Sequence, residues 1–527
     1  MAKLSRRDML KLGVLGTAAA VLPLERIATA SSGVSRIAES KLPKPFTIPF
    51  AVPPVAKPVW KAVDDGYDYY EIKQQATKVE ILPGYKSDLW AYNGIPAGPT
   101  IKARRGRPTV VRQVNNLPAR HPVLGYESTT STHLHGSGSL PQYDGYASDV
   151  TGPGQWKNYH YPNYQDARTL WYHDHGIHHT AENAYMGLAA MYIMTDELEQ
   201  SLPIPHGDYD VPLIIRDAMF NENGNMMYDD NSHSGLYGDV ILVNGRPWPV
   251  MKVERRKYRF RFLNASLSRG YTFRLSTGDP FWIIGTDGGL MQFPQQTTTF
   301  RQSMAERYEV IIDFAKYTKG QRIVLQNLGV KNAVDYDGTR NVMAFDVVGD
   351  ATDVRGNAIP DLLNPNPPAM DLVETPNLRT RRFEFIRTNG EWTINGKTWH
   401  DVEDSEYEYV WADPGLGDTE IWEFVNTSGG WFHPVHVHLI DFKILDRNGR
   451  PPFNYELGPK DTVYVGENET VRVIAKFGPH QGKYMIHCHN LVHEDHDMMA
   501  QFRVGPPSEG DDPIKADPCH DLPAPEL

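Results

Sequence analysis

Four pairs of histidines, each separated by a single residue, are the side chains of this sequence best suited to chemistry. The pairs are His133/His135, His173/His175, His436/His438 and His487/His489. With 20 histidines in 527 residues, chance placement yields only about 0.8 such pairs. On a β-strand, residues i and i+2 point to the same face, so each pair can aim both imidazoles into one pocket. The spacing therefore predicts a site that holds transition-metal ions.

Copper is the metal that this set of ligands favours. Neutral imidazole binds copper well, and copper(II) stands highest in the divalent affinity series. Structural zinc sites instead favour paired cysteines and closed tetrahedra, whereas the only cysteines are Cys488 and Cys519. We interpret Cys519, in an acidic, proline-rich segment, as a free thiol; an intermolecular disulfide or a stray metal ligand are the alternatives.

The last histidine pair brackets a cysteine. His487-Cys488-His489 is followed by His493 and Met498, so one cysteine, one histidine and one methionine of this segment are three members of the two-histidine, cysteine and weak methionine set of a blue copper centre. If Cys488 lies on a strand, His487 and His489 point together away from it. One short segment can then serve two metal sites.

These segments resemble the four copper motifs of the multicopper oxidases, in their usual order. Within that family the sequence is most similar to the bilirubin oxidases and the bacterial spore-coat-type laccases, through Trp431 and the stretch His489–Met499. Further similarity covers nearly all of the chain after its N-terminal segment. The matching segments are Pro99–Ile101, Thr132–Gly136, Trp171–His175, Val243–Trp248, His433–His438 and His487–Met498.

The resemblance implies four copper ions and a role for each ligand. His433, Cys488, His493 and axial Met498 would bind the type 1 copper, which accepts electrons from the donor. The other positions would form the oxygen-reducing cluster, with His133 and His436 on the type 2 copper. The remaining six would hold the type 3 pair: His135, His173, His175, His438, His487 and His489. The family pattern leaves out His160, His178, His179 and His496.

Two carboxylates and one tryptophan are candidates for supporting roles. Asp144 resembles the family's acid near the oxygen-reducing cluster, and Glu494 directly follows a predicted copper ligand. Both are candidate proton donors; the alternatives are that Asp144 shapes a turn and that Glu494 is a solvated charge. Trp431 is a candidate contact for the electron donor, or an ordinary core tryptophan.

The length and composition predict an all-β chain of about three β-sandwich domains, and the family resemblance implies three consecutive cupredoxin-like Greek-key sandwiches. Turn-forming residues are abundant, with 44 Gly and 40 Pro. Three alternating segments end in asparagine, at Asn115, Asn264 and Asn426, and their spacing of about 150 residues suits one domain each. We place the domains at 45–200, 206–355 and 377–506, with an acidic tail at 507–527 that is either mobile or a strap over the surface.

The N-terminus predicts export. Arg6 and Arg7 precede an apolar run that ends before Ala28-Thr29-Ala30, so residues 1–30 resemble a twin-arginine signal peptide. The apolar run is too short to span a bilayer, so we expect no stable membrane insertion. A net charge of -12 without a basic stripe argues against nucleic acid as a partner. We expect a periplasmic or extracellular monomer whose precursor uses the twin-arginine export machinery.

The leading functional hypothesis is an exported oxidase that uses O2 as acceptor and a phenol, aromatic amine or bilirubin-like donor. The first alternative is an oxidase of Cu(I) or Mn(II). Cuprous oxidases of the family often carry a methionine-rich insertion, whereas the 16 methionines are scattered, without a cluster between Arg301 and Pro376. The second alternative is a copper-binding protein without turnover. The identity of the donor depends on loops whose shape the sequence does not predict.

Overall fold

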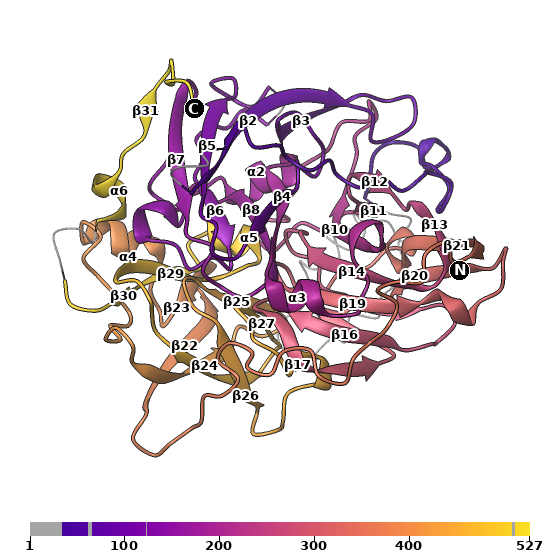
Figure 1. Cartoon of the computed structure of the whole chain (residues 1–527). Coiled ribbons are helices and arrows are strands. Elements are labelled where there is room, and N and C mark those ends of the chain that lie inside the picture. Colours follow the sequence, from indigo (N-terminus) through magenta and orange to yellow (C-terminus); the bar gives the residue numbers. More distant parts are fainter. Residues whose placement is uncertain (1–33, 62–65, 123, 508–511) are drawn as a thin grey trace, which may run out of the picture.

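The computed structural model describes residues 34–61, 66–122, 124–507 and 512–527, and it consists mainly of β-sheets (Figure 1). The strands of these residues form six sheets, which follow one another along the chain as three pairs. The predicted export signal at residues 1–30 lies outside the described residues. Among the described residues, no helix is both long enough and apolar enough to cross a bilayer.

The first pair of sheets also recruits a strand from the far end of the chain. Its larger sheet contains β1 (Trp60–Lys61), β2 (Asp68–Val79), β3 (Ser87–Tyr92), β5 (Thr109–Asn116), β7 (Gln155–Tyr161) and β31 (His520–Asp521). Its smaller sheet contains β4 (Ile101–Arg104), β9 (Ala189–Thr195), β8 (Arg168–Asp174) and β6 (Thr132–His135).

The second and third pairs follow in sequence. The second pair joins β12 (Arg246–Pro247), β11 (Val240–Val243), β10 (Asp210–Ala218), β14 (Lys257–Asn264), β19 (Arg307–Asp313), β16 (Phe281–Thr286) and β17 (Gly289–Thr297) in one sheet, and β13 (Val250–Arg255), β21 (Asn341–Asp350), β20 (Arg322–Asn327), β15 (Tyr271–Leu275) and β18 (Phe300–Gln302) in the other. The third pair joins β23 (Glu391–Ile394), β22 (Arg379–Thr388), β24 (Thr419–Asn426), β28 (Thr470–Lys476) and β26 (Phe442–Arg447), and then β27 (Thr462–Val465), β25 (His433–Val437), β29 (Gly482–Cys488) and β30 (Met499–Val504).

Helices are short and lie between strands. The described α-helices are α2 (Thr180–Met186), α3 (Glu197–Ser201), α4 (Trp399–Asp404), α5 (Leu491–Asp495) and α6 (Pro513–Ala516). The single turns of 3-10 helix are η1 (Glu39–Lys41), η2 (Pro141–Tyr143), η3 (Gly207–Tyr209), η4 (Phe314–Lys316), η5 (Asp337–Arg340) and η6 (Asn454–Glu456). The prediction of an all-β chain with three cupredoxin-like sandwiches is confirmed, while the domain boundaries stay predictions.

The three alternating segments of the sequence occupy equivalent places in the three pairs. They are β5, β14 and β24, and each lies between one parallel and one antiparallel neighbour. The buried amides of Asn115, Asn264 and Asn426 each donate to two backbone carbonyls and accept from the N–H two residues on. The same turn therefore ends the same strand in each pair, because an asparagine side chain can replace backbone hydrogen bonds.

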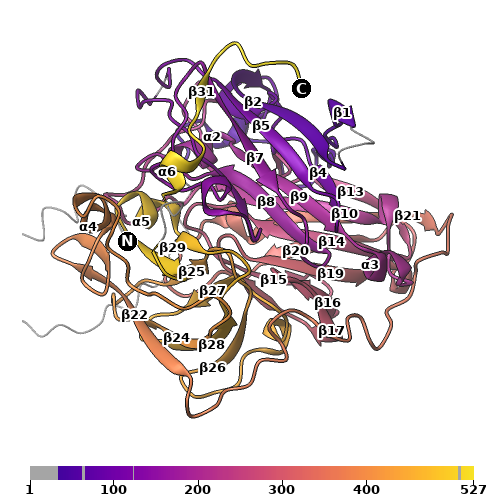
Figure 2. The same ribbon diagram turned by 60° about the vertical axis from the view of Figure 1, so that its left-hand side comes forward.

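The first and third sheet pairs adjoin each other in both views, with β8 close to β25 and β29 (Figures 1 and 2). Alternating residues of the third pair's two sheets, such as Phe424 on β24 and Val435 on β25, share one apolar core. A larger core connects the first and second pairs and includes Tyr70 on β2 and Phe262 on β14. Burial of these faces holds rigid strands around the place where the histidines meet.

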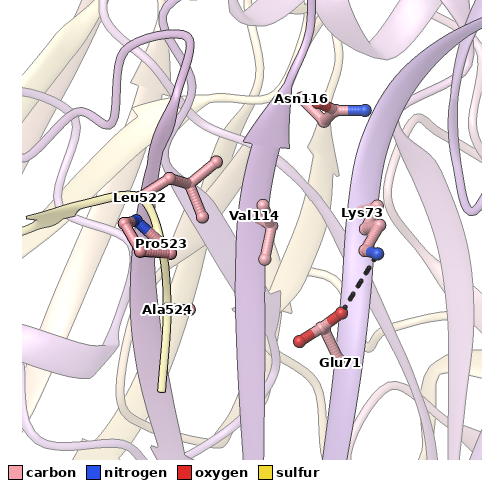
Figure 3. Close-up of a pocket in the computed structure, with 7 residues that line it drawn as sticks. All are labelled: Glu71, Lys73, Val114, Asn116, Leu522, Pro523 and Ala524. Atoms are coloured by element: carbon pink, nitrogen blue, oxygen red, sulfur yellow. Dashed lines mark ion pairs between the residues drawn. The ribbon is translucent and has the colours of Figure 1, made fainter. Parts of the chain in front are cut away.

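The C-terminal residues 512–527 form a strap over the first sheet pair (Figure 2). β31 pairs with β7, Ile514 packs into the cluster of Tyr146 and Trp399, and the guanidinium of Arg112 donates to the carbonyl of Pro525. Figure 3 shows Leu522 to Ala524 alongside the strands that carry Val114 and Lys73, where a shallow pocket remains. Of the two alternatives for the tail, the structure supports the strap.

Truncation after residue 511 is expected to lower the free energy of unfolding by about 1–3 kcal/mol, because it removes backbone hydrogen bonds and apolar contacts. The shift of the unfolding midpoint in guanidinium measures the effect. Lys515→Ala is the matched control, because the Lys515 ammonium is exposed and pairs only locally with Asp512. Equal midpoints for the truncated and full chains would contradict a stabilising strap.

Candidate metal centre

The four histidine pairs meet where the first sheet pair faces the third. In the first pair, His133 on β6 lies opposite His173 on β8; in the third, His436 on β25 lies opposite His487 on β29. Across this boundary, Nε2 of His133 lies 3.4 Å from Nε2 of His436. All eight imidazoles are buried. The predicted convergence is present, although only His133 and His135 lie together on one strand: His175, His438 and His489 directly follow the ends of β8, β25 and β29.

Six of the eight imidazoles form two groups of three. One group is His135, His173 and His489, and the other is His175, His438 and His487; within each, one potential ligand atom per residue lies within 4.8 Å of the others. In the second group, Nε2 of His487 lies 3.3 Å from Nε2 of His175 and 3.2 Å from Nε2 of His438. Ligand atoms bound to one ion at about 2.0–2.1 Å lie about 3–3.5 Å apart, so this spacing fits an ion.

Hydrogen bonds from the other ring nitrogen select which nitrogen faces the centre. Nδ1 of His133 donates to the backbone carbonyl of Asp144 (2.5 Å), and Nδ1 of His438 donates to the Asp144 carboxylate (2.7 Å). Nδ1 of His436 donates to the backbone carbonyl of Asp461 (2.9 Å). Each bond places the proton on Nδ1 and leaves the lone pair on Nε2, which is the usual way to orient a metal-binding imidazole.

Several ring nitrogens of the group formed by His135, His173 and His489 have no hydrogen-bond partner among the described residues. These are Nδ1 of His135, Nε2 of His173 and both nitrogens of His489. Leaving a buried polar atom unpaired costs about 1–3 kcal/mol, and an ion bound by these nitrogens removes that cost. The residues therefore fit a bound metal ion, and imidazole donors suit copper.

Burial favours the neutral form of seven of these imidazoles. Removal from water lowers the pKa of His175 to about 4 and holds the pKa well below the usual range for His133, His135, His173, His436, His438 and His489. Neutral imidazole has the free lone pair that a metal ion requires.

A separate group lies on the other side of β29. His433, Cys488 and His493 are fully buried, with Nδ1 of His433 3.2 Å from the Cys488 sulfur and Nδ1 of His493 3.7 Å from it. The two Nδ1 atoms are 3.3 Å apart. Met498 is buried in the same apolar cluster, and its carbonyl accepts from the Cys488 N–H. His433, Cys488 and His493 thus lie together as one potential metal-binding group, while Met498 stays a predicted axial ligand.

The cysteine-containing group and the histidine centre are joined by adjacent residues of one strand. Cys488 pairs with Val435 and faces the apolar core of the third sheet pair, whereas His487 pairs with His436 and faces the histidine centre. His489 also belongs to the histidine centre. The alternation predicted from the sequence is present, and it places the thiol one peptide unit from ligands of both groups of three histidines.

Both candidate carboxylates lie against the histidines. The Asp144 carboxylate is buried beside His438, and burial raises the pKa of Asp144 well above its usual value. Glu494, on α5, has Oε2 2.8 Å from Nδ1 of His487 and Oε1 3.5 Å from Nε2 of His175. Burial alone raises the pKa of Glu494, but these imidazoles outweigh it and lower the pKa. Neither carboxylate is a solvated surface charge.

The sequence did not single out Asp461 or Arg307. Asp461 accepts from Nε2 of His135 at 3.0 Å, and the Arg307 guanidinium donates to it at 2.7 Å. Arg307 comes from the second sheet pair, so the contact ties all three pairs to the histidines. Neither residue lies in a histidine motif, and the available signal was only that a charge stands within an apolar strand pattern.

Tryptophans cover the cysteine-containing group. The ring of Trp392, which the sequence did not single out, stacks on His493 at 3.7 Å between ring centroids. The predicted Trp431 is half-buried, 5.7 Å from His493 and 5.3 Å from Trp392. Trp431 therefore lies at the surface edge of this group.

The histidines outside the predicted ligand positions contact other side chains. His160 lies beside Tyr143, His178 beside His400, His179 beside Tyr126 and His496 beside Asp230. They are not members of the groups described above.

Comparisons with known proteins agree with this geometry. Three models described as multicopper oxidase match residues 73–199, 171–343 and 364–508. The chain is 43% identical over 481 residues to a bilirubin oxidase of Albifimbria verrucaria, covering 87% of this chain and 81% of that protein. It is 35% identical over 523 residues to a laccase of Bacillus subtilis strain 168, covering 88% and 99%.

Solved structures give the same result. A laccase from Pediococcus acidilactici has a TM-score of 0.78 at 30% identity and covers 90% of this chain and 96% of that one. The McoA multicopper oxidase of Aquifex aeolicus has a TM-score of 0.75 at 30% identity, covering 87% and 100%.

Arg307→Met is expected to destabilise the protein by about 3–5 kcal/mol, because it leaves the buried Asp461 carboxylate without its cation. The guanidinium unfolding midpoint measures the loss. Arg322→Met is the matched control: its pair with Asp346 is partly exposed and is expected to contribute about 0–1 kcal/mol. Similar small shifts in both variants would show that the Arg307 pair does not stabilise the centre.

Proposed function

Since this chain belongs to the multicopper oxidase family, we propose that it is an exported oxidase of small organic donors that reduces O2 to water. The observation that carries the proposal is the placement of Cys488 between His487 and His489 at the end of β29. A cysteine-containing site that accepts electrons is thereby joined to a histidine centre that can use them.

We assign one copper ion to each group of ligands. His433, Cys488 and His493, with Met498 as weak axial ligand, would hold the type 1 copper. His133 and His436 would hold the type 2 copper. The two type 3 positions would be the groups His135/His173/His489 and His175/His438/His487, in which the short nitrogen separations and unpaired nitrogens support the assignment.

Bound copper supplies one-electron redox steps, and four such ions can match single-electron donors to the four-electron reduction of O2. The chain's contribution is to hold the ligands in position. Adjacent peptide units provide a short covalent route from the Cys488 sulfur to His487 and His489. Burial of the cysteine-containing group keeps water away from the thiolate.

Proton delivery is assigned to Asp144 and Glu494. The reduction of O2 to water consumes four protons, which must reach a centre that is buried from solvent. Asp144 touches His438 on one side of the histidine centre, and Glu494 lies beside His487 and His175. Asp144, whose pKa is raised by burial, can hold a proton at a carboxyl oxygen beside His438, whereas Glu494, whose pKa is lowered, can accept a proton and pass it on beside His487 and His175.

The donor side is assigned to the surface near Trp431. His433 and His493 are fully buried, and a donor must pass electrons through groups that cover them. The half-buried Trp431 lies next to Trp392, whose ring stacks on His493. The bilirubin oxidase and laccases among the relatives favour organic donors, and the scattered methionines do not favour Cu(I).

We further propose a periplasmic or extracellular monomer. The support is the N-terminal segment, in which Arg6 and Arg7 precede an apolar run and Ala28-Thr29-Ala30. Export through the twin-arginine route would carry the protein after folding.

Copper-loaded protein is expected to consume O2 with bilirubin and with a phenol, with four donor electrons used per O2. Adding Cu(I) and Mn(II) at equal concentrations to this panel tests the donor class. The residues that cover the proposed type 1 ligands are aromatic, so we expect the organic donors to react faster. A Trp431→Ala variant should raise KM for organic donors. Faster turnover with the metal ions would indicate a metal oxidase, and no turnover with any donor would indicate a copper-binding protein.

Asp144→Asn is expected to slow reoxidation of the reduced protein by O2 about 10²-fold, because the amide cannot deliver a proton. Anaerobic bleaching of the blue absorption by donor should be unchanged, and stopped-flow absorbance separates the two half-reactions. The control is Asp166→Asn, an aspartate of the same sheet pair whose partner Arg105 is half exposed. Unchanged reoxidation in the Asp144 variant would remove Asp144 from the mechanism.

A further inference from the structure

Two histidines and an aspartate outside the predicted copper ligands meet at the protein surface. Nδ1 of His233 lies 2.9 Å from Oδ2 of Asp230, and Nε2 of His496 lies 3.3 Å from the same oxygen. The two imidazole centroids are 3.4 Å apart. Asp230 and His233 come from the loop after β10, whereas His496 follows α5, so the tertiary structure alone brings the three side chains together.

The spacing of these donors fits one metal ion. Donors about 2.0–2.2 Å from a shared ion lie about 3–3.5 Å apart, and the Asp230 oxygen lies 2.9 Å from Nδ1 of His233 and 3.3 Å from Nε2 of His496. Two imidazoles and one carboxylate are a familiar set for divalent first-row transition metals, with further positions left open. The side chains of His233 and His496 are 52% and 34% exposed, so water can occupy those open positions.

The loop that carries His233 is held in an unusual conformation. Asn231, Ser232 and His233 all have positive φ, at 53°, 54° and 64°. Side chains other than glycine rarely adopt this region, and three in succession require support from their surroundings. Trp392 supplies it by donating from Nε1 to the His233 carbonyl at 2.8 Å, and Arg387 donates to the Ser232 carbonyl at 3.4 Å.

The same loop reaches the cysteine-containing group. The carbonyl oxygen of Ser234 lies 3.4 Å from Nε2 of His493, and Trp392, which bonds to His233, stacks on the His493 ring. An ion held by His233 would therefore lie one residue away from a group that contacts the proposed type 1 ligand.

A second surface histidine provides a contrast. His400 also has two carboxylate neighbours, Glu403 at 3.2 Å and Asp497 at 3.5 Å, and its side chain is 59% exposed. However, Glu403 faces Nδ1 and Asp497 faces Nε2, on different edges of the ring. One ion cannot use both contacts, because the two nitrogen lone pairs of an imidazole diverge.

We propose that Asp230, His233 and His496 form a binding site for one divalent first-row transition-metal ion, separate from the four copper positions. The bound ion can exchange with solvent, since His233 and His496 are partly exposed. An ion at this site would lie close to the residues that cover the proposed type 1 ligands, where it can act on the donor side of the protein. The binding rests on the surface geometry and does not depend on the proposed function.

Calorimetric titration of copper-loaded protein with Zn2+ tests the site. We expect the unaltered protein to bind one added equivalent. In Asp230→Asn and in His233→Gln, the Kd should rise at least roughly 10–100-fold, the effect that follows loss of a supporting partner. His400→Gln, the matched control, should bind Zn2+ as the unaltered protein does. Absence of the added equivalent, or equal binding by the His233→Gln variant, would overturn the proposal. Because His233 is half exposed, that variant decides the question even if Asp230→Asn fails to fold.

The reduction potential of the blue centre gives a second readout, which rests on the proposed function. Zn2+ at this site should raise the potential, because a nearby cation favours the less positive, reduced form. The shift should be absent in His233→Gln. If the protein has no blue centre, the proposed function fails while the Zn2+ titration still decides whether the site exists; a blue centre whose potential ignores bound Zn2+ would place the ion elsewhere.

Discussion

Burial of imidazole nitrogens that have no partner within the protein is the constraint on which this structure depends. Each buried and unpaired nitrogen costs about 1–3 kcal/mol, and His135, His173 and His489 all carry such atoms among the described residues. This cost is acceptable only where a metal ion compensates for it. The surrounding fold must therefore hold the ligands in place, and the apolar cores of the sheet pairs supply that rigidity.

Buried ion pairs connect the sheet pairs around this centre. Arg307 of the second pair reaches Asp461, which orients His135. Arg259 and Arg261 on β14 share Glu199, which lies after the last strand of the first pair. Such pairs add little net stability, because removing the charges from water offsets their attraction. Their geometry is specific, however, and a shift of one sheet pair against another would leave charges unpaired.

Strand alternation turns one segment into a junction. Cys488 and His487 face opposite sides of β29, and His489 directly follows that strand, so one short segment reaches both the cysteine-containing group and the histidine centre. The strained loop at Asn231 to His233 lies against the cysteine-containing group, since its backbone contacts Trp392, which covers His493. The surface near the cysteine group is thus assembled from two distant parts of the chain.

The sequence by itself determined the ligand types, their pairing and the strand character of their surroundings, because i, i+2 spacing and the asparagine-ended strands are local properties. It also offered Asp144, through resemblance, and Glu494, through its place directly after a predicted ligand, as candidate neighbours of the centre. The tertiary structure decided which histidines share a group, placed Asp461 and Arg307 behind them, and joined His233 to His496. Those contacts cross between sheet pairs, and no local spacing encodes the distance between residues that only packing brings together.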